Sequence, residues 1–221
     1  MILKTKKDYE KATAYLSKND PKMNTLINHF GMPKRRKYTS YFEALTRAII
    51  YQQLSGKVAM KIEGRFVNLY KTDGYPSPDV VVKTTIKKLR SAGLSDRKAE
   101  YIKGIAKTFL DEIWSPSKIS RLSDEDIKEK LVQLKGIGPW TADMFLMGCL
   151  NRSDILPVGD YGIMRGFQLF YNRKEMPSEE YMIKKAKPWI PYRSVASYYL
   201  WGLANEGVSF RKFTSNIKKK V

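Results

Sequence analysis

The stretch Leu134–Met147, LKGIGPWTADMFLM, places two glycines and a proline directly before an apolar run that opens with a tryptophan. Glycines ahead of a helix often bind phosphates through unpaired main-chain N–H groups. A dinucleotide fold needs a strand before the glycines, whereas here Ser123 and Asp126 form a helix-capping pair followed by apolar residues at helical spacing. The pattern therefore predicts a helix, a Gly-Ile-Gly hairpin and a second helix over about residues 124–150.

Within the hairpin, we expect Ile137 to pack between the two helices. Gly136 and Gly138 would let the chain turn sharply and approach a ligand closely. The N–H groups at the start of the second helix would then suit a phosphate oxygen. Helix pairs joined by glycine turns are often purely structural, so the hairpin alone does not establish a nucleic-acid site.

The charge balance is strongly basic: 221 residues carry 41 Lys and Arg against 22 Asp and Glu, a net charge of +19. Such an excess predicts a polyanionic partner, with nucleic acid first and an anionic membrane surface second. Basic runs occur at residues 33–37, 83–90, 96–103 and 216–220. Because they are spread along the chain, the charge is expected to cover a folded surface.

The sequence contains few cysteine or histidine residues that could bind a metal or form a disulfide. Cys149 is the only cysteine and His29 the only histidine, so neither a disulfide framework, an iron–sulfur cluster nor a cysteine zinc site is expected. Cys149 lies in an apolar run and is predicted to be a small buried side chain. The first residues contain no long apolar stretch, which predicts an intracellular protein of the cytoplasm, nucleoid or nucleus without a membrane partner.

Nearly every segment has helical periodicity, and no convincing alternation of period two occurs, so the predicted fold class is all-α. Ser55, Ser77 and Ser95 are placed to begin helices. The three valines at 80–82 leave a strand open as an alternative. Helices are predicted over 41–54, 56–71, 80–93, 96–114, 139–150, 160–172, 178–189 and 192–207.

Asp160 follows a Pro-Val-Gly turn at the start of a predicted helix. Aspartate is a favoured N-cap, and that role alone would explain it. A helix of about a dozen residues followed by a short turn brings the chain back by roughly 18 Å, so Asp160 is also expected near the hairpin helix and Trp140. A carboxylate beside an aromatic hollow, on a basic surface with a phosphate grip, is typical of base excision.

LKGIGPWTADMFLM followed by LPVGDYGI resembles the helix–hairpin–helix (HhH-GPD) DNA glycosylase superfamily, and the tryptophan after GIGP resembles its alkylpurine branch, the 3-methyladenine glycosylase II type. The likeness includes residues 44–62, 93–106 and 189–203, and covers about residues 40–205. It implies a single domain over 1–221, made of two helical lobes with an active-site cleft between them. The 40 residues before Tyr41 are too few for the β-rich domain of the bacterial type, which indicates a compact form.

The resemblance implies that Asp160 is the catalytic carboxylate and that Trp140, Trp201 and Met144 line the base pocket. The chemistry agrees, because base loss develops positive charge on the sugar, which a fixed carboxylate stabilises while it orients water. A cationic alkylated purine departs easily and stacks well on indole. Met144 stands where the bacterial enzymes have an aromatic residue, and ordinary core packing is the alternative for either tryptophan.

The resemblance further implies a double-stranded DNA partner whose damaged base is flipped out, leaving a hole that the protein fills. Gln53 would be the inserted residue and Gln52 its neighbour. Gly136, Gly138 and Thr141 would contact a phosphate. No metal site and no cofactor are expected, apart from a monovalent cation that the hairpin carbonyls would suit, and the protein is expected to be a monomer.

Strand-nicking relatives use a lysine just before the TA dipeptide of the hairpin helix, where this sequence has Trp140. Lys135 lies on the other side of the hairpin. The predicted activity is therefore monofunctional excision of 3-methyladenine- and 7-methylguanine-type bases. Two alternatives stay open: a glycosylase for oxidised or deaminated bases, and a non-enzymatic helix–hairpin–helix DNA-binding module.

Overall fold

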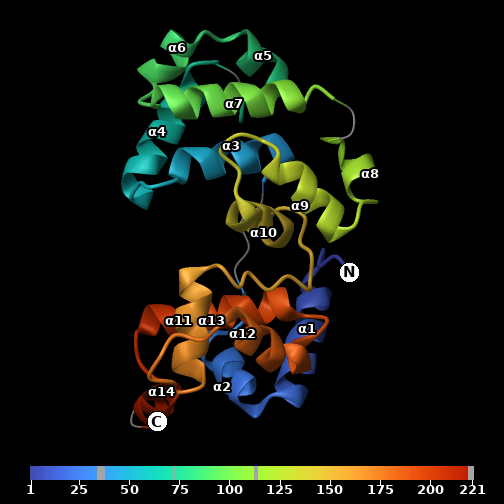
Figure 1. Cartoon of the computed structure of the whole chain (residues 1–221), viewed down its shortest axis with the longest axis vertical. Helices are drawn as coiled ribbons and strands as arrows, with labels where there is room; N and C mark the ends of the chain where they lie inside the picture. The colour runs from blue at the N-terminus through green and yellow to red at the C-terminus, as the bar shows by residue number, and fades with distance from the viewer. Residues whose placement is uncertain (34–37, 72, 112–113, 219–221) are drawn as a thin grey trace. The chain divides into compact units, whose positions relative to one another are not determined.

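The computed structural model describes residues 1–33, 38–71, 73–111 and 114–218. Within these ranges the regular structure is helical, apart from one isolated antiparallel bridge between Ile2 and Arg152. This confirms the predicted all-α class. The chain divides into two compact units, which we call the central unit (residues 37–145) and the terminal unit (residues 1–36 and 146–221) (Figure 1). That residues 1–221 act as one domain with a cleft stays a prediction.

The central unit is organised around α7, which lies between α3 on one side and α5 and α6 on the other (Figure 1). Its core is formed by buried apolar side chains that recur at helical spacing, such as Ile102 and Ile105 of α7 and Phe42 and Ile49 of α3. The helices that begin in this unit are α3 (Tyr41–Tyr51), α4 (Gly56–Asn68), α5 (Pro78–Lys83), α6 (Ile86–Ser91), α7 (Asp96–Thr108), α8 (Pro116–Ile119), α9 (Asp124–Val132) and α10 (Pro139–Gly148).

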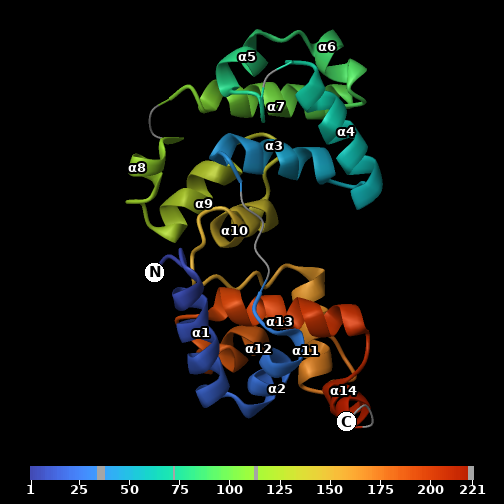
Figure 2. The ribbon, with the colours of Figure 1, turned by 180° about the vertical axis from the view of Figure 1, so that it is seen from behind.

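In the terminal unit, α13 packs against α11, α1 and α2 (Figure 2). At Gly166, α11 lies so close to α13 that a Cβ on this glycine would fall 2.6 Å from the carbonyl oxygen of Leu200. Trp189, Phe167 and Phe170 fill the core between these helices. The elements are α1 (Lys6–Asn19), α2 (Pro21–Phe30), α11 (Tyr161–Phe170), α12 (Glu179–Lys185), the short 3-10 helix η2 (Lys187–Trp189), α13 (Arg193–Glu206) and α14 (Phe210–Lys218).

One predicted helix is wrong in its extent. Residues 80–93 form two short helices, α5 and α6, because Thr84 is extended and the Thr85 side chain accepts a hydrogen bond from the N–H of Lys88, which begins α6. The valines at 80–82 lie in α5, so the strand alternative is wrong as well. Four further helices end at least three residues earlier than predicted: α3 at Tyr51, α4 at Asn68, α7 at Thr108 and α12 at Lys185.

The predicted caps are largely confirmed. The side chains of Ser55 and Ser95 each accept a hydrogen bond from the third residue beyond, and Ser123 forms a reciprocal capping box with Asp126. Ser77 begins α5 without such a bond. Cys149 is half-buried, contrary to the expectation of a fully buried side chain, because it lies at the end of α10.

Residues 34–37 of the first predicted basic run and residues 219–220 of the last lie outside the described residues. Among the described residues, no helix combines the length and apolar character needed to cross a membrane.

Candidate functional site

The connection between α9 and α10 is the predicted hairpin, and it belongs to the central unit. Gly136 has a φ of +89°, and a Cβ there would fall 2.3 Å from Cδ2 of Tyr101, so this position requires glycine. Ile137 is 5% exposed, as expected for a residue packed between two helices. Gly138 does not have a positive φ, and a Cβ on it would meet no atom of the described residues within 4 Å. This geometry does not require glycine for the turn at position 138. It is compatible with the prediction that Gly138 lets the main chain approach a ligand closely.

Side chains of the hairpin helix differ widely in exposure. Trp140 is 48% exposed, which is high for an indole, and Met144 is half-buried. Thr141 is only 4% exposed, so its side chain offers little surface for a phosphate, and the contact stays a prediction. The ammonium of Lys128 on α9 pairs with the carboxylate of Asp143 on α10. Burial raises the pKa of Asp143, and the Lys128 ammonium opposes that rise.

The two glutamines of the α3–α4 loop (residues 52–55) have different environments. The side-chain Nε2 of Gln52 donates a hydrogen bond to the carbonyl oxygen of Gly136 at 2.8 Å, which ties this loop to the hairpin. Gln53 is exposed and has a φ of +56° in the left-handed region. The residue beside the hairpin is therefore Gln52, and the one that projects is Gln53.

The carboxylate of Asp160 lies in the terminal unit, where it caps α11. Its Oδ1 accepts hydrogen bonds from the main-chain N–H of Ile163 at 2.8 Å and from Nε1 of Trp201 on α13 at 2.7 Å. Asp160 is 9% exposed. The N-cap role is confirmed, and the indole contact adds a second donor that fixes the orientation of the carboxylate.

Gly162 makes the space for that indole. A Cβ on Gly162 would fall 2.8 Å from Cδ1 of Trp201 and 3.1 Å from Oδ1 of Asp160. Only a residue without a side chain allows the edge of the indole to lie against the first turn of α11. In the sequence, the glycine two residues after Asp160 is a signal for this close contact.

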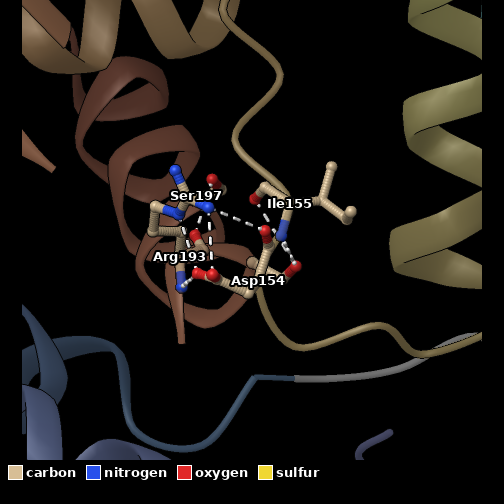
Figure 3. Close-up of polar contacts among 5 residues, drawn as sticks. Asp154, Ile155, Arg193 and Ser197 are labelled. Atoms are coloured by element: carbon tan, nitrogen blue, oxygen red, sulfur yellow. Dashed lines mark hydrogen bonds and ion pairs between the residues drawn. The ribbon is translucent and has the colours of Figure 1, made fainter. Parts of the chain in front are cut away.

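The segment before Asp160 is fastened to the start of α13 (Figure 3). Nε and Nη2 of Arg193 donate to the two carboxylate oxygens of Asp154 at 2.7 and 2.9 Å. The main-chain N–H of Ile155 donates to Oγ of Ser194 at 2.9 Å. A bidentate pair and a buried hydroxyl thus hold residues 153–155 against the helix that carries Trp201. Neither residue of this ion pair is marked in the sequence by a motif or a local pattern.

Two groups of predicted site residues therefore form. Asp160 and Trp201 are in contact in the terminal unit. Gln52 contacts Gly136 in the central unit, whose hairpin also carries Gly138 and helix α10. The expected proximity of Asp160 to Trp140 stays a prediction, because these two residues belong to different units.

A glycine hairpin between two helices, followed along the chain by a buried aspartate that caps a later helix, is the arrangement expected of a helix–hairpin–helix DNA glycosylase. The family model described as the HhH-GPD superfamily base excision DNA repair protein matches residues 46–191. The chain belongs to this superfamily.

The relatives agree with the predicted branch. DNA-3-methyladenine glycosylase 1 of Schizosaccharomyces pombe is 32% identical over 187 residues, which cover 84% of this chain and 82% of that protein. The solved structure of an S. pombe 3-methyladenine DNA glycosylase in complex with abasic DNA has a TM-score of 0.75, with 32% identity, over 86% of this chain and 95% of that one.

A DNA-3-methyladenine glycosidase from Bacillus halodurans is also similar, with a TM-score of 0.82 and 32% identity over 92% of this chain and 95% of that one. The predicted likeness to the 3-methyladenine glycosylases is thereby confirmed, as is the predicted fold.

Proposed function

We propose that this DNA glycosylase removes alkylated purines of the 3-methyladenine and 7-methylguanine type from double-stranded DNA, and that it does so by hydrolysis alone. The observation that carries the proposal is the buried carboxylate of Asp160, held at the N-terminus of α11 by the N–H groups of Ile163 and Trp201. Relatives named as 3-methyladenine glycosylases support the choice of substrate.

Asp160 is proposed as the catalytic residue. Breaking the glycosidic bond develops positive charge on the deoxyribose, and a carboxylate that is already oriented stabilises this charge without reorganisation. The same carboxylate orients or deprotonates the attacking water. An alkylated purine is already cationic, so its departure requires little acid catalysis. A fixed carboxylate is then the main group that the reaction demands.

Trp140, Trp201 and Met144 are proposed to select the base. The half-exposed indole of Trp140 offers an electron-rich face, on which a cationic purine stacks more strongly than a neutral one. Trp201 has an additional task, because its N–H is engaged by Asp160. The half-buried Met144 is flexible and polarisable, and so adapts to bases of differing shape.

Gln53 is proposed to fill the hole left by the flipped base. Its side chain is exposed, whereas that of Gln52 is engaged by the Gly136 carbonyl. An amide side chain both fills space and hydrogen-bonds the orphaned partner base. Gly136, Gly138 and Thr141 are proposed to contact a phosphate, and the large net positive charge supports binding to undamaged duplex that weakens steeply with salt.

The hairpin carbonyls are proposed to hold a monovalent cation. Carbonyl oxygens are suitable ligands for such hard ions. The Gly136 oxygen accepts one hydrogen bond, from Gln52, and a carbonyl has a second lone pair to offer. Exchange of potassium for tetramethylammonium at constant ionic strength should weaken duplex binding if this cation is held.

Hydrolysis without strand cleavage follows from the residue at position 140. An indole cannot form the Schiff base that leads to β-elimination, and Lys135 is an exposed residue of the hairpin. The product is then an intact strand with an abasic site.

The proposal is tested with duplexes that each carry one lesion: 3-methyladenine, 7-methylguanine, ethenoadenine, hypoxanthine, uracil or 8-oxoguanine. We expect release of the alkylated purines, with strand breaks only after alkali. Borohydride added during turnover should trap no covalent adduct. Preferred release of 8-oxoguanine or uracil would identify a different substrate class. Binding without release of any base would identify a non-enzymatic DNA-binding module.

A further inference from the structure

The α3–α4 loop is anchored by a lysine that lies far from it in sequence. Lys98, in the first turn of α7, donates from Nζ to the carbonyl oxygen of Ile50 at 2.8 Å and to that of Gln52 at 2.8 Å. These carbonyls lie at the C-terminal end of α3, where the last carbonyls of a helix are unpaired and carry partial negative charge. An ammonium at this place satisfies two acceptors and complements the helix dipole.

The same loop is anchored a second time through a side chain. Gln52 accepts from Lys98 at its main-chain oxygen and donates from Nε2 to the carbonyl oxygen of Gly136. Both ends of this residue are therefore engaged, one by α7 and the other by the hairpin. The next residue is Gln53, exposed and at a φ of +56°, a conformation that non-glycine residues rarely adopt.

The helices on either side of the loop are also fixed to one another. Arg47 on α3 pairs with Glu63 on α4, and both side chains are buried. The hydroxyl of Tyr51, the last residue of α3, donates to Oε2 of Glu63 at 3.0 Å. The loop thus begins and ends on helices that cannot slide past each other, while Lys98 and Gln52 fix its backbone in between.

Anchoring the loop with Lys98 carries a desolvation cost. This lysine is half-buried, and burial lowers the pKa of its ammonium, since removal of a charge from water is unfavourable. A methionine of similar length would fill the same space without that cost. The position of the charge is therefore informative, because among the described residues its hydrogen bonds go to the two carbonyls on either side of Tyr51, where the loop begins.

We propose that Lys98 is a positioning residue that holds Gln53 in place for insertion into the base stack. This proposal rests on the proposed function in one respect, namely that Gln53 is the inserted residue. It assigns to a lysine of the basic run 96–103 a role inside the protein instead of contact with a phosphate. It also explains why an exposed residue keeps a backbone conformation that is rarely adopted: its predecessor is held from two directions.

The chain offers a matched control for Lys98→Met. Lys103 lies on the same helix, and its Nζ donates to the carbonyl oxygen of Thr84, the C-cap residue of α5, at 2.7 Å. Both lysines thus cap the C-terminal end of another helix, but only Lys98 caps the helix that leads into the α3–α4 loop. Lys103→Met removes an equivalent interaction without touching that loop.

Release of 7-methylguanine is measured from a duplex and from the same sequence as a single strand, in which no hole in the stack has to be filled. Lys98→Met should lower kcat/KM on the duplex by about tenfold, the size expected for charge-assisted hydrogen bonds. The kcat/KM for release from the single strand should stay within about twofold of the value for the unaltered protein. Lys103→Met should leave the ratio of duplex to single-strand release unchanged. Lys98→Arg should regain much of the duplex activity that Lys98→Met loses.

Two readouts do not depend on catalysis. Hydrogen exchange of the amides of residues 52–55 should be faster in Lys98→Met than in Lys103→Met. Fluorescence of a 2-aminopurine placed beside an abasic-site analogue should respond less to binding of Lys98→Met, because insertion is impaired.

If the unaltered protein releases no base, the proposed function fails, and these two readouts still decide the role of Lys98. Unchanged loop exchange, or an equal loss of duplex activity in both methionine variants, would overturn that role.

Discussion

The hairpin and the Asp160 site are held together in opposite ways. At the hairpin, the anchored atoms belong to the main chain: the carbonyl of Gly136 accepts from Gln52, and the carbonyls at the end of α3 accept from Lys98. At the Asp160 site the anchored atom is a side-chain oxygen, which accepts from Ile163 and Trp201. One region fixes a backbone path, and the other fixes a single charge.

This difference determines which substitutions each region tolerates. A backbone path survives the replacement of most side chains on it, provided that residues with unusual dihedral angles are kept. A single charge has no substitute, however well its surroundings are preserved. The hairpin should therefore be sensitive at one glycine and tolerant elsewhere, whereas the Asp160 site should be sensitive at the carboxylate itself and at the groups that hold it.

The largest effect is expected for Asp160→Asn. The amide oxygen still accepts from Ile163 and caps α11 almost as well, but the negative charge required in the transition state is lost. Base release in single-turnover experiments should fall by about 10³-fold or more. Thermal unfolding and affinity for undamaged duplex should be unchanged. Release at the rate of the unaltered protein would remove Asp160 from the mechanism.

The next effect concerns stability and compares two glycines of one hairpin. Gly136→Ala should lower the free energy of unfolding by about 2 kcal/mol, because φ is positive there and the new Cβ would collide with the ring of Tyr101. Gly138→Ala should change it by less than about 0.5 kcal/mol, since the new Cβ would meet no atom of the described residues within 4 Å. Urea denaturation measures both. Equal losses would mean that the backbone path is not what Gly136 protects.

A smaller effect is expected for Trp201→Phe, which keeps an aromatic ring but removes the N–H that donates a hydrogen bond to Asp160. The kcat for base release should fall by about tenfold, as expected for one hydrogen bond to a charged group. Gly162→Ala should act in the same direction, because its methyl group would displace the indole. If KM rises while kcat is kept in Trp201→Phe, stacking is the role of this tryptophan and orientation of the carboxylate is not.

The features that could be predicted from the sequence are local ones. The Ser123 capping box, the buried Ile137 and the N-cap role of Asp160 all depend on residues within a few positions of one another. The break between α5 and α6 also has a local signal, the threonine pair at 84–85, which the apolar pattern of the segment outweighed.

The contacts that could not be predicted join residues far apart in sequence. Gln52 and Gly136 are 84 positions apart, Lys98 lies 46 positions from Gln52, and Asp154 and Arg193 are 39 positions apart. In the sequence, Lys98 is one basic residue in a basic run, and nothing marks it as an internal donor. Only the packing of α7 against α3 gives it that role.

The smallest effect is expected for Lys135→Ala, the one change that removes charge from the hairpin without altering its path. Lys135 is exposed, so its loss should leave stability and the maximal rate of base release unchanged. If its ammonium contacts a phosphate, affinity for undamaged duplex should fall slightly, and the slope of log affinity against log salt should become shallower by about 0.9. Titrations at several salt concentrations separate this loss of one phosphate contact from a change in the main-chain grip, which would weaken binding without changing the slope. A large loss of base release in Lys135→Ala would contradict the view that the hairpin acts through its backbone, and borohydride trapping that disappears in this variant would identify the lysine as a nucleophile.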